Sequence, residues 1–223
     1  MSHNRISHVL PALAVVLVLA ATSAQGALLN FNMEPFPDIF SGYIDVVYTA
    51  ATDSFVANGY TLAYYDGVTQ WDMEDYLPDS FLIQATIDSS GNPVGGTLTL
   101  SGPVQGYGPT LLTADLTEFG WAFFDTLNPN SDAAMFDWKF QVTGGDMAGL
   151  YGGIGATVGT ILSCVSVDAG VSETLFTADF NNNGGEPGWG SAVADSAPPV
   201  PEPLSAIVLI GGAVALLRRR AAR

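Results

Sequence analysis

The clearest metal-binding pattern in this chain is a run of oxygen-bearing side chains, in which Asp179, Asn181 and Asn183 alternate with other residues and a glycine follows. Oxygen ligands at positions 1, 3 and 5 with glycine at position 6 form the first half of a calcium loop, because the glycine permits a sharp turn. Gly190 occupies position 12, where a bidentate glutamate belongs, and Glu186 stands at position 8 instead. The candidate calcium ligands are therefore Asp179, Asn181, Asn183 and Glu186, although a polar loop at the end of a strand is the preferred interpretation.

A second group of reactive side chains surrounds a tryptophan. Trp71, Asp72, Glu74 and Tyr76 place carboxylates between two aromatic rings. Sugar-binding sites use aromatic faces against C–H groups and carboxylates against hydroxyls, and glycosidases need two carboxylates about 5–10 Å apart. So short a segment reaches that separation in many conformations. A solvated acidic loop with one buried tryptophan is the preferred interpretation, and a glycan-binding group is the alternative.

The residue types that the chain lacks exclude most catalytic mechanisms. Both histidines, His3 and His8, lie in the first 26 residues, and Lys139 is the only base between residues 27 and 203. All 22 carboxylates lie in that stretch, so its formal charge is −21. Ser-His-Asp and Cys-His catalysis would lack their base, histidine zinc sites their ligands, and a phosphate clamp its arginines. Nucleic acid would be repelled. We therefore predict a protein that is not an enzyme, whose charge serves solubility in salty water, cation binding or both.

The single cysteine, Cys164, excludes an intrachain disulfide. It lies in the strand-like run 160–167, which favours a buried structural cysteine, with an intermolecular bridge as the alternative. An apolar core must then hold the body together, and about 170 residues suffice for one domain.

The body is rich in strand-forming residues. Phe81–Ile87 and Thr97–Ser101 alternate apolar and polar residues around a turn at residues 89–93, which predicts a hairpin. Further strands are predicted at residues 42–49, 59–65, 110–115, 119–124, 136–142, 160–167 and 174–180. This spacing predicts an all-β fold, a single antiparallel β-sandwich of jelly-roll or Ig-like type over residues 27–190.

One internal similarity suggests a repeated hairpin. Residues 110–116 match residues 174–180 at five of seven positions. Asp115 and Asp179 would then stand at equivalent strand ends, and chance similarity between two strands is the alternative.

Both ends of the chain are predicted to be targeting segments. Residues 1–26 have a basic start at Arg5, an apolar stretch and small residues before a cleavage point, which indicates a signal-peptide helix. Cleavage is expected after Gly26, with cleavage after Ala24 as the alternative. Residues 191–199 are predicted to be a linker. Residues 200–223 form a tail of three parts: Val200, Pro201, Glu202 and Pro203; an apolar helix at 204–217; and a basic cluster at 218–223 with Arg218, Arg219 and Arg220.

The tail helix would be a marginal transmembrane helix. Fourteen residues reach about 21 Å, whereas the hydrocarbon layer is about 30 Å thick. The arginines would extend toward the headgroups and stay on the cytoplasmic side, which would put the body across the membrane.

The order of Val-Pro-Glu-Pro, short apolar helix and arginine cluster resembles the PEP-CTERM sorting signal of Gram-negative bacteria. The resemblance covers residues 199–223 and implies recognition by exosortase, a membrane peptidase-transferase, followed by export to a surface rich in exopolysaccharide. Leu204-Ser205 after the second proline and the trailing Ala-Ala-Arg depart from the family pattern. The tail says nothing about the activity of the body, because it is shared by bodies of unrelated fold.

These observations predict an exported, non-enzymatic protein of the cell surface or the extracellular matrix. Its expected partners are exosortase, the secretion machinery and exopolysaccharide, with transient membrane association and no nucleic acid. The alternatives are a carboxylate-based extracellular glycan hydrolase or glycan-binding module, and an unprocessed membrane-anchored surface protein.

Overall fold

The computed structural model describes residues 27–73, 79–124, 133–164, 175–184 and 190–200, and regular structure in these ranges is almost entirely β. The elements are β1 (Asp38–Thr49), η1 (Ala50–Thr52), β2 (Ser54–Tyr65), β3 (Gln70–Asp72), β4 (Phe81–Ile87), β5 (Pro93–Ser101), β6 (Thr110–Phe124), β7 (Ala133–Gly144), β8 (Thr157–Cys164), η2 (Leu175–Thr177), β9 (Phe180–Asn181) and β10 (Ala192–Ala197). The expected all-β class is therefore confirmed for these ranges.

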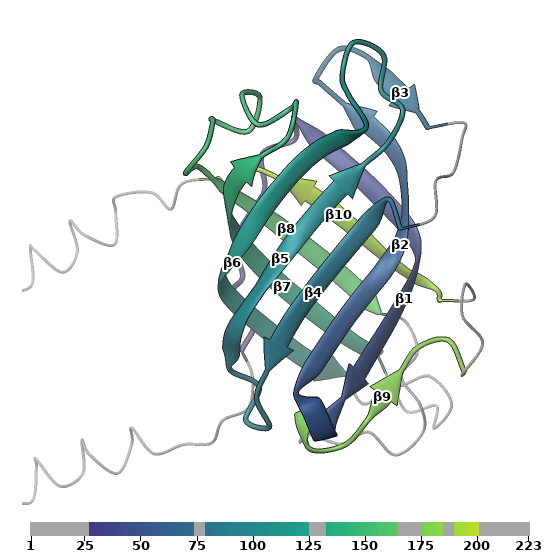
Figure 1. Ribbon diagram of the computed structural model, residues 1–223, viewed down its shortest axis with the longest axis vertical. Helices are drawn as coiled ribbons and strands as arrows, with labels where there is room; N and C mark the ends of the chain where they lie inside the picture. Colours follow the sequence, from purple (N-terminus) through teal and green to yellow (C-terminus); the bar gives the residue numbers. More distant parts are fainter. Residues whose placement is uncertain (1–26, 74–78, 125–132, 165–174, 185–189, 201–223) are drawn as a thin grey trace, which may run out of the picture.

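Eight strands close into an antiparallel barrel, as Figure 1 shows. From β4 to β8 each strand pairs with the next in the chain, β8 pairs with β10, and β1 joins β10 to β2, which returns to β4. The short strands β3 and β9 extend from β2 and β1. The predicted β-sandwich is wrong. A sandwich and a barrel share strand number and turn spacing, and they differ in whether the edges meet, which depends on pairing between distant strands.

The barrel interior is filled by side chains that alternate along the strands. Phe81, Ile83, Ala85 and Ile87 of β4 are all buried, and β4 pairs antiparallel with β5, so the predicted hairpin and its inward face are confirmed. Aromatic rings occupy much of the interior: the ring centroid of Phe55 lies 5.2 Å from that of Phe136 and 5.0 Å from that of Trp138. The two strands predicted at 110–115 and 119–124 are one strand, β6, with an irregular pairing between Leu116 and Glu118.

One end of the barrel is closed by an aromatic plug, Phe176 and Phe180. Both side chains are buried, and both rings contact Tyr48, with centroids 5.0 Å and 5.3 Å away. The strand predicted at 174–180 is wrong over most of its described length, because Leu175–Thr177 form the 3-10 helix η2 and the strand β9 begins only at Phe180. The repeated-hairpin hypothesis fails with it, since Asp115 lies within β6.

The predicted linker 191–199 instead contains β10, the strand that closes the barrel. Ala192 and Ala194 are buried between β8 and β1, and Val193 and Asp195 face outward. The inward side chains Ala192, Ala194 and Ser196 are small, so the segment carries a weak hydrophobic pattern although it pairs with strands on both sides. From its sequence alone, such a segment is predicted to be a spacer, because the strands with which it pairs cannot be read from its own residues.

An N-terminal strap, residues 27–34, crosses the outer surface of β6, β7 and β8. The backbone N–H of Asn30 donates to a carboxylate oxygen of Asp137 at 3.1 Å. A Cβ at Gly120 would lie 2.5 Å from the backbone oxygen of Ala27, so the close approach requires a glycine there. Met33 bridges to Pro199, and the N–H of Val200 donates to the backbone oxygen of Asn32 at 2.8 Å. The strap therefore ties the beginning of the described chain to its end.

The two targeting helices predicted from the sequence, at residues 1–26 and 204–217, lie outside the described residues. Nowhere in the described ranges is a helix long and apolar enough to cross a membrane. The expectation of a transmembrane helix is wrong for that part of the chain, whose two helical segments are 3-10 turns of three residues each.

Candidate functional site

The described part of the predicted calcium loop fixes the plug to β1, through the pairing of β9, and to η1, which follows β1. Asp179 accepts a hydrogen bond from the N–H of Ala50 at 2.7 Å, and Asn181 accepts one from the N–H of Asn183 at 3.2 Å. Glu186 lies outside the described residues. No cluster of three or more His, Cys, Asp or Glu side chains suited to a metal occurs among the residues that the structure describes. Calcium binding by the whole set of four ligands stays a prediction.

Asn182, which the sequence analysis passed over, has the most specific contacts of this segment. Its side chain is 8% exposed. It accepts from the N–H of Val46 at 2.7 Å and donates to the backbone oxygen of Ile44 at 2.9 Å, so it pairs with β1 as a neighbouring strand would. Such a buried amide has a structural role, because it satisfies a donor and an acceptor that β1 would otherwise leave unpaired.

The predicted glycan group around Trp71 is only partly described, because Glu74 and Tyr76 fall outside the described residues. One face of the Trp71 ring is covered by Tyr64, with centroids 5.3 Å apart and planes at 17°. Asp72 is exposed and accepts a hydrogen bond from the Gln70 side chain at 2.6 Å. The stacking on Tyr64 shows that this tryptophan anchors β3 to the barrel.

Of the sorting motif, only Val200 is described, and its backbone pairs with the strap. Pro201, Glu202, Pro203, Arg218, Arg219 and Arg220 lie outside the described residues. Cys164 ends β8, in the backbone register of Ala134.

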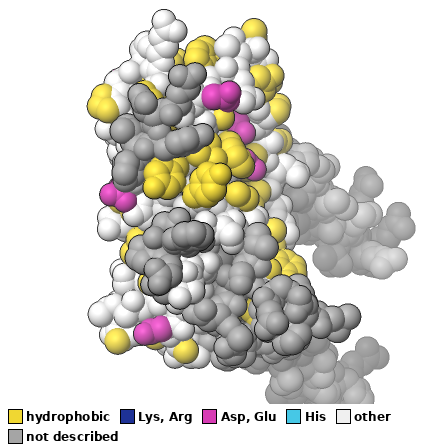
Figure 2. All heavy atoms as spheres, turned by 90° about the vertical axis from the view of Figure 1, so that its right-hand side faces the viewer, with side chains coloured by type: hydrophobic (Ala, Val, Ile, Leu, Met, Phe, Trp, Pro, Cys, Tyr) yellow, Lys and Arg dark blue, Asp and Glu magenta, His cyan; other side chains and the backbone are white. Residues whose placement is uncertain are grey.

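A different surface stands out on the outer face of β10, β1 and β2. It is a hollow, called here the aromatic hollow, lined by Phe40, Gly42, Tyr43, Leu62, Gly190, Ser191 and Val193. Its larger side chains are unusually open to solvent: Tyr43 is 63% exposed, Val193 40% and Phe40 38%. Figure 2 shows hydrophobic side chains gathered on this side of the molecule, with acidic side chains beside them.

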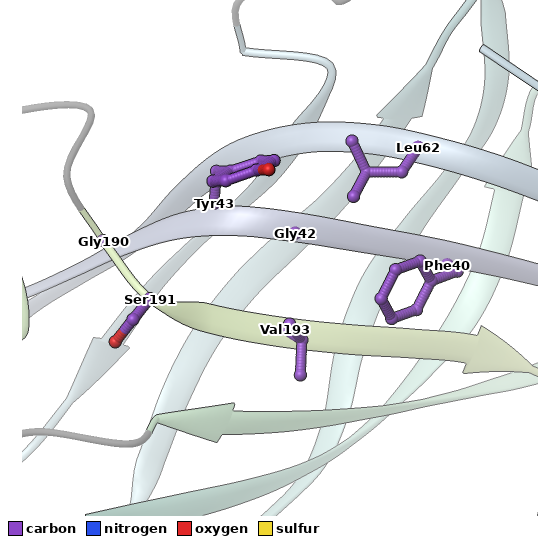
Figure 3. Close-up of a pocket in the computed structure, with 7 residues that line it drawn as sticks. All are labelled: Phe40, Gly42, Tyr43, Leu62, Gly190, Ser191 and Val193. Carbon is purple, nitrogen blue, oxygen red and sulfur yellow. The ribbon is translucent and has the colours of Figure 1, made fainter.

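The aromatic hollow depends on a β-bulge in β1. Pairing of β1 is interrupted between Ser41 and Ile44 on the β10 side and between Gly42 and Asp45 on the β2 side. Within the interruption Tyr43 has a φ of 52°, a left-handed conformation that costs a residue other than glycine about 1 kcal/mol or more. Bulges redirect side chains away from the regular alternation of a strand. In Figure 3 Phe40, Tyr43 and Leu62 surround Gly42, which carries no side chain and leaves the floor of the hollow open.

Two carboxylates lie beside the aromatic hollow. Asp195 of β10 is paired directly with Phe40 of β1, and Asp38 is two residues before Phe40. Burial, followed by the charge of Asp195, raises the pKa of Asp38 to about 6, and burial also raises the pKa of Asp195. One carboxylate oxygen of Asp38 is buried without a hydrogen-bond partner. Neither residue lines the hollow itself, and both lie beside Phe40 at one edge of it.

Sequence reasoning missed this surface, although a usable signal was present. The strand predicted at 42–49 includes Tyr43, but the bulge shifts the alternation, so the outward position of that ring could not be read from the pattern. The signal was the dipeptide Gly42-Tyr43 inside an apolar strand, because a glycine there often marks a bulge.

Comparisons of this chain with protein-family models, with curated proteins and with solved structures returned no match.

Proposed function

We propose that this chain is an exported, non-enzymatic component of the cell surface or the extracellular matrix. Exosortase and the secretion machinery deliver it through the two terminal targeting segments, and exopolysaccharide is its partner outside the cell. The resemblance of residues 199–223 to a sorting signal supports the destination. The barrel supports a role in binding rather than in catalysis.

The observation that carries this proposal is the filled interior of the barrel. The rings of Phe55, Phe136 and Trp138 contact one another there, and Phe176 and Phe180 close one end. Small-molecule sites in barrels usually lie inside the barrel or at its mouth. Because side chains occupy that space here, recognition takes place on the outer face, where the aromatic hollow lies.

The composition also favours a role in binding over a role in catalysis. Lys139 is the single base between residues 27 and 203, and its ammonium lies 2.9 Å from a carboxylate oxygen of Glu118 on the adjacent strand. A general base or a phosphate clamp would have to be built from carboxylates alone, which suits few reactions apart from glycoside hydrolysis.

A carboxylate-based glycan hydrolase is the second candidate, and one observation favours it. Asp38 and Asp195 both have a raised pKa, and a raised pKa is what a general acid needs. The binding role is preferred because both acids lie beside Phe40 at one edge of the aromatic hollow, whereas a hydrolase needs them on opposite sides of the scissile bond. Release of new reducing ends from a polysaccharide, lost in Asp38→Asn, would establish the hydrolase.

The proposal is tested in the native bacterium by fractionation and by mass spectrometry of the chain termini. We expect a chain that begins near Ala27 and has lost its basic end to be recovered from the surface or the medium. A variant with Glu202→Ala and with Arg218, Arg219 and Arg220 replaced by alanine should be exported and retained in the envelope. Recovery of the full-length chain as a soluble intracellular protein, with both ends intact, would contradict the proposal. Envelope peptides that end in Arg223 would show that the tail is not processed.

A further inference from the structure

We infer that the aromatic hollow on β10, β1 and β2 is a binding site for a neutral polysaccharide, which stacks on Tyr43 and Phe40. This deepens the proposed function, because it assumes an exported chain that meets polysaccharide outside the cell. It names both the surface and the chemical class of the partner.

The first support is the conformation of Tyr43. The β-bulge holds a non-glycine residue in the left-handed region and leaves its ring 63% exposed. The ring has an edge contact with Tyr60, with centroids 6.4 Å apart at 83°, which leaves a face available. Unfavourable backbone conformations concentrate at binding sites, where the surrounding structure holds a side chain in a required position. Here the backbone cost serves to present an aromatic ring to solvent.

The second support is the shape of the surface between the rings. Gly42 and Gly190 contribute no side chains, and a Cβ at Gly42 would lie 2.7 Å from a methyl carbon of Leu62. The space between the rings is therefore left open, and the residues around it are mostly apolar. A pyranose ring has an apolar face of C–H groups and a rim of hydroxyls, so it fits such a surface flat against an aromatic ring.

The third support is the distribution of charge. Asp195, directly opposite Phe40 across the β1–β10 pairing, offers carboxylate oxygens to sugar hydroxyls, and Ser191 adds a hydroxyl. Lys139 lies on β7, three strands away from β1 around the barrel, and is paired with Glu118. A polyuronate or a phosphorylated glycan would meet carboxylates and no opposing cation on the described part of this face. Neutral polyols, which donate hydrogen bonds and carry no charge, are the matching partners.

The test measures binding of the purified, processed chain to soluble polysaccharides by affinity electrophoresis and calorimetry. The probes are two neutral glucans, one β-linked and one α-linked, and alginate as the anionic polymer. The key variant is Tyr43→Asn, because asparagine tolerates the left-handed conformation and removes the ring without adding backbone strain. Phe40→Thr removes the second ring in a residue that favours strands. The matched control is Phe124→Thr, since Phe124 is 45% exposed on β6, away from the hollow.

We expect at least one neutral glucan to bind, alginate to bind more weakly, and Tyr43→Asn and Phe40→Thr each to raise Kd by about ten-fold, equivalent to the loss of one good contact. Phe124→Thr should leave Kd unchanged, and circular dichroism should show every variant folded. No binding to either glucan, equal binding of alginate, or an unchanged Kd in Tyr43→Asn would overturn the inference. Sedimentation without glycan provides a further test. Self-association that is abolished by Tyr43→Asn would also overturn the inference, because the partner at the hollow would then be a second copy of this chain. Any of these results with a chain still exported and processed would leave the exported, cell-surface role standing and would remove only this site and its neutral ligand.

Discussion

Replacing Asp38 with asparagine should stabilise the protein, in a way that depends on pH. The carboxyl is partly buried beside Asp195, and its pKa is raised from 3.8 to about 6. One of its oxygens is buried with no hydrogen-bond partner. The native state therefore disfavours the charged form at neutral pH, and asparagine removes the charge while keeping the shape.

The size of the effect follows from the shift in pKa. A shift of about two units corresponds to roughly 3 kcal/mol, since each unit is about 1.4 kcal/mol. The side chain is partly exposed and screened by solvent, so we expect about 1–2 kcal/mol in Asp38→Asn at pH 7.5. For a domain of this size that raises Tm by about 2–8 °C.

The sign of the pH dependence is fixed by linkage. Between the unfolded pKa of 3.8 and the folded pKa of about 6, the native state binds more protons at Asp38 than the unfolded state does. The free energy of unfolding of the unsubstituted protein therefore gains a contribution from this residue as pH falls through that window. The advantage of Asp38→Asn should be complete above about pH 6 and should disappear below about pH 4.

Urea denaturation at pH 7.5, 5 and 3.5, followed by tryptophan fluorescence, measures this difference. Asp66→Asn serves as the control of opposite sign. Asp66 accepts the N–H groups of Val68 and Thr69 at 2.8 Å and 2.7 Å, and these bonds lower its pKa. That variant should be less stable than the unsubstituted protein at pH 7.5 and should differ less at pH 3.5. A stabilisation by Asp38→Asn that persists at pH 3.5, or no stabilisation at pH 7.5, would refute the assignment of an unfavourable buried charge.

Three further predictions test how the barrel ends and the strap are held. Asn182→Ala should lower the free energy of unfolding by about 2–4 kcal/mol, because it leaves a donor and an acceptor of β1 buried and unpaired; a change under 1 kcal/mol in urea denaturation would contradict this. Gly120→Ala should displace the N-terminal strap, so limited proteolysis should cleave the first described residues faster than in the unsubstituted protein, and equal cleavage rates would argue against the close packing. Asp179→Ala should lower Tm in EDTA through loss of the Ala50 contact. If the variant loses more Tm in millimolar calcium than in EDTA, the predicted metal site is established. Equal losses in calcium and in EDTA would contradict the metal site.

The individual strands were largely predictable from the sequence, and the reasons are local. In Phe81–Ile87 every second side chain is apolar, and the structure buries those four. The turn after this strand carries Gly91 with a φ of 79°, which glycine adopts at little cost. Where both signals were present, element type and inward face were correctly predicted. Where these two signals are absent, as in Ala192–Ala197, the sequence predicts a linker although the structure forms a strand.

The candidate site was less predictable, because its parts come from three strands. Tyr43, Leu62 and Val193 are far apart in the chain and meet only because β10 and β2 both pair with β1. The groups that sequence reasoning proposed, around Asp179 and Trp71, are contiguous in the chain. Their described members contact Ala50, Asn183, Gln70 and Tyr64. Proximity along the chain is a weak guide to a surface built from pairing between strands.

Composition and local periodicity by themselves determined an acidic, all-β body without histidine, because charge, residue type and alternation are properties of short stretches. The targeting segments at its ends stay a prediction. Only the tertiary structure decided that the sheet closes into a barrel, that β10 completes it, and that the bulge at Tyr43 turns an aromatic ring outward. Closure depends on the register of β1 against two partners more than a hundred residues apart, β2 and β10. No alternation within one strand encodes which distant strand lies beside it.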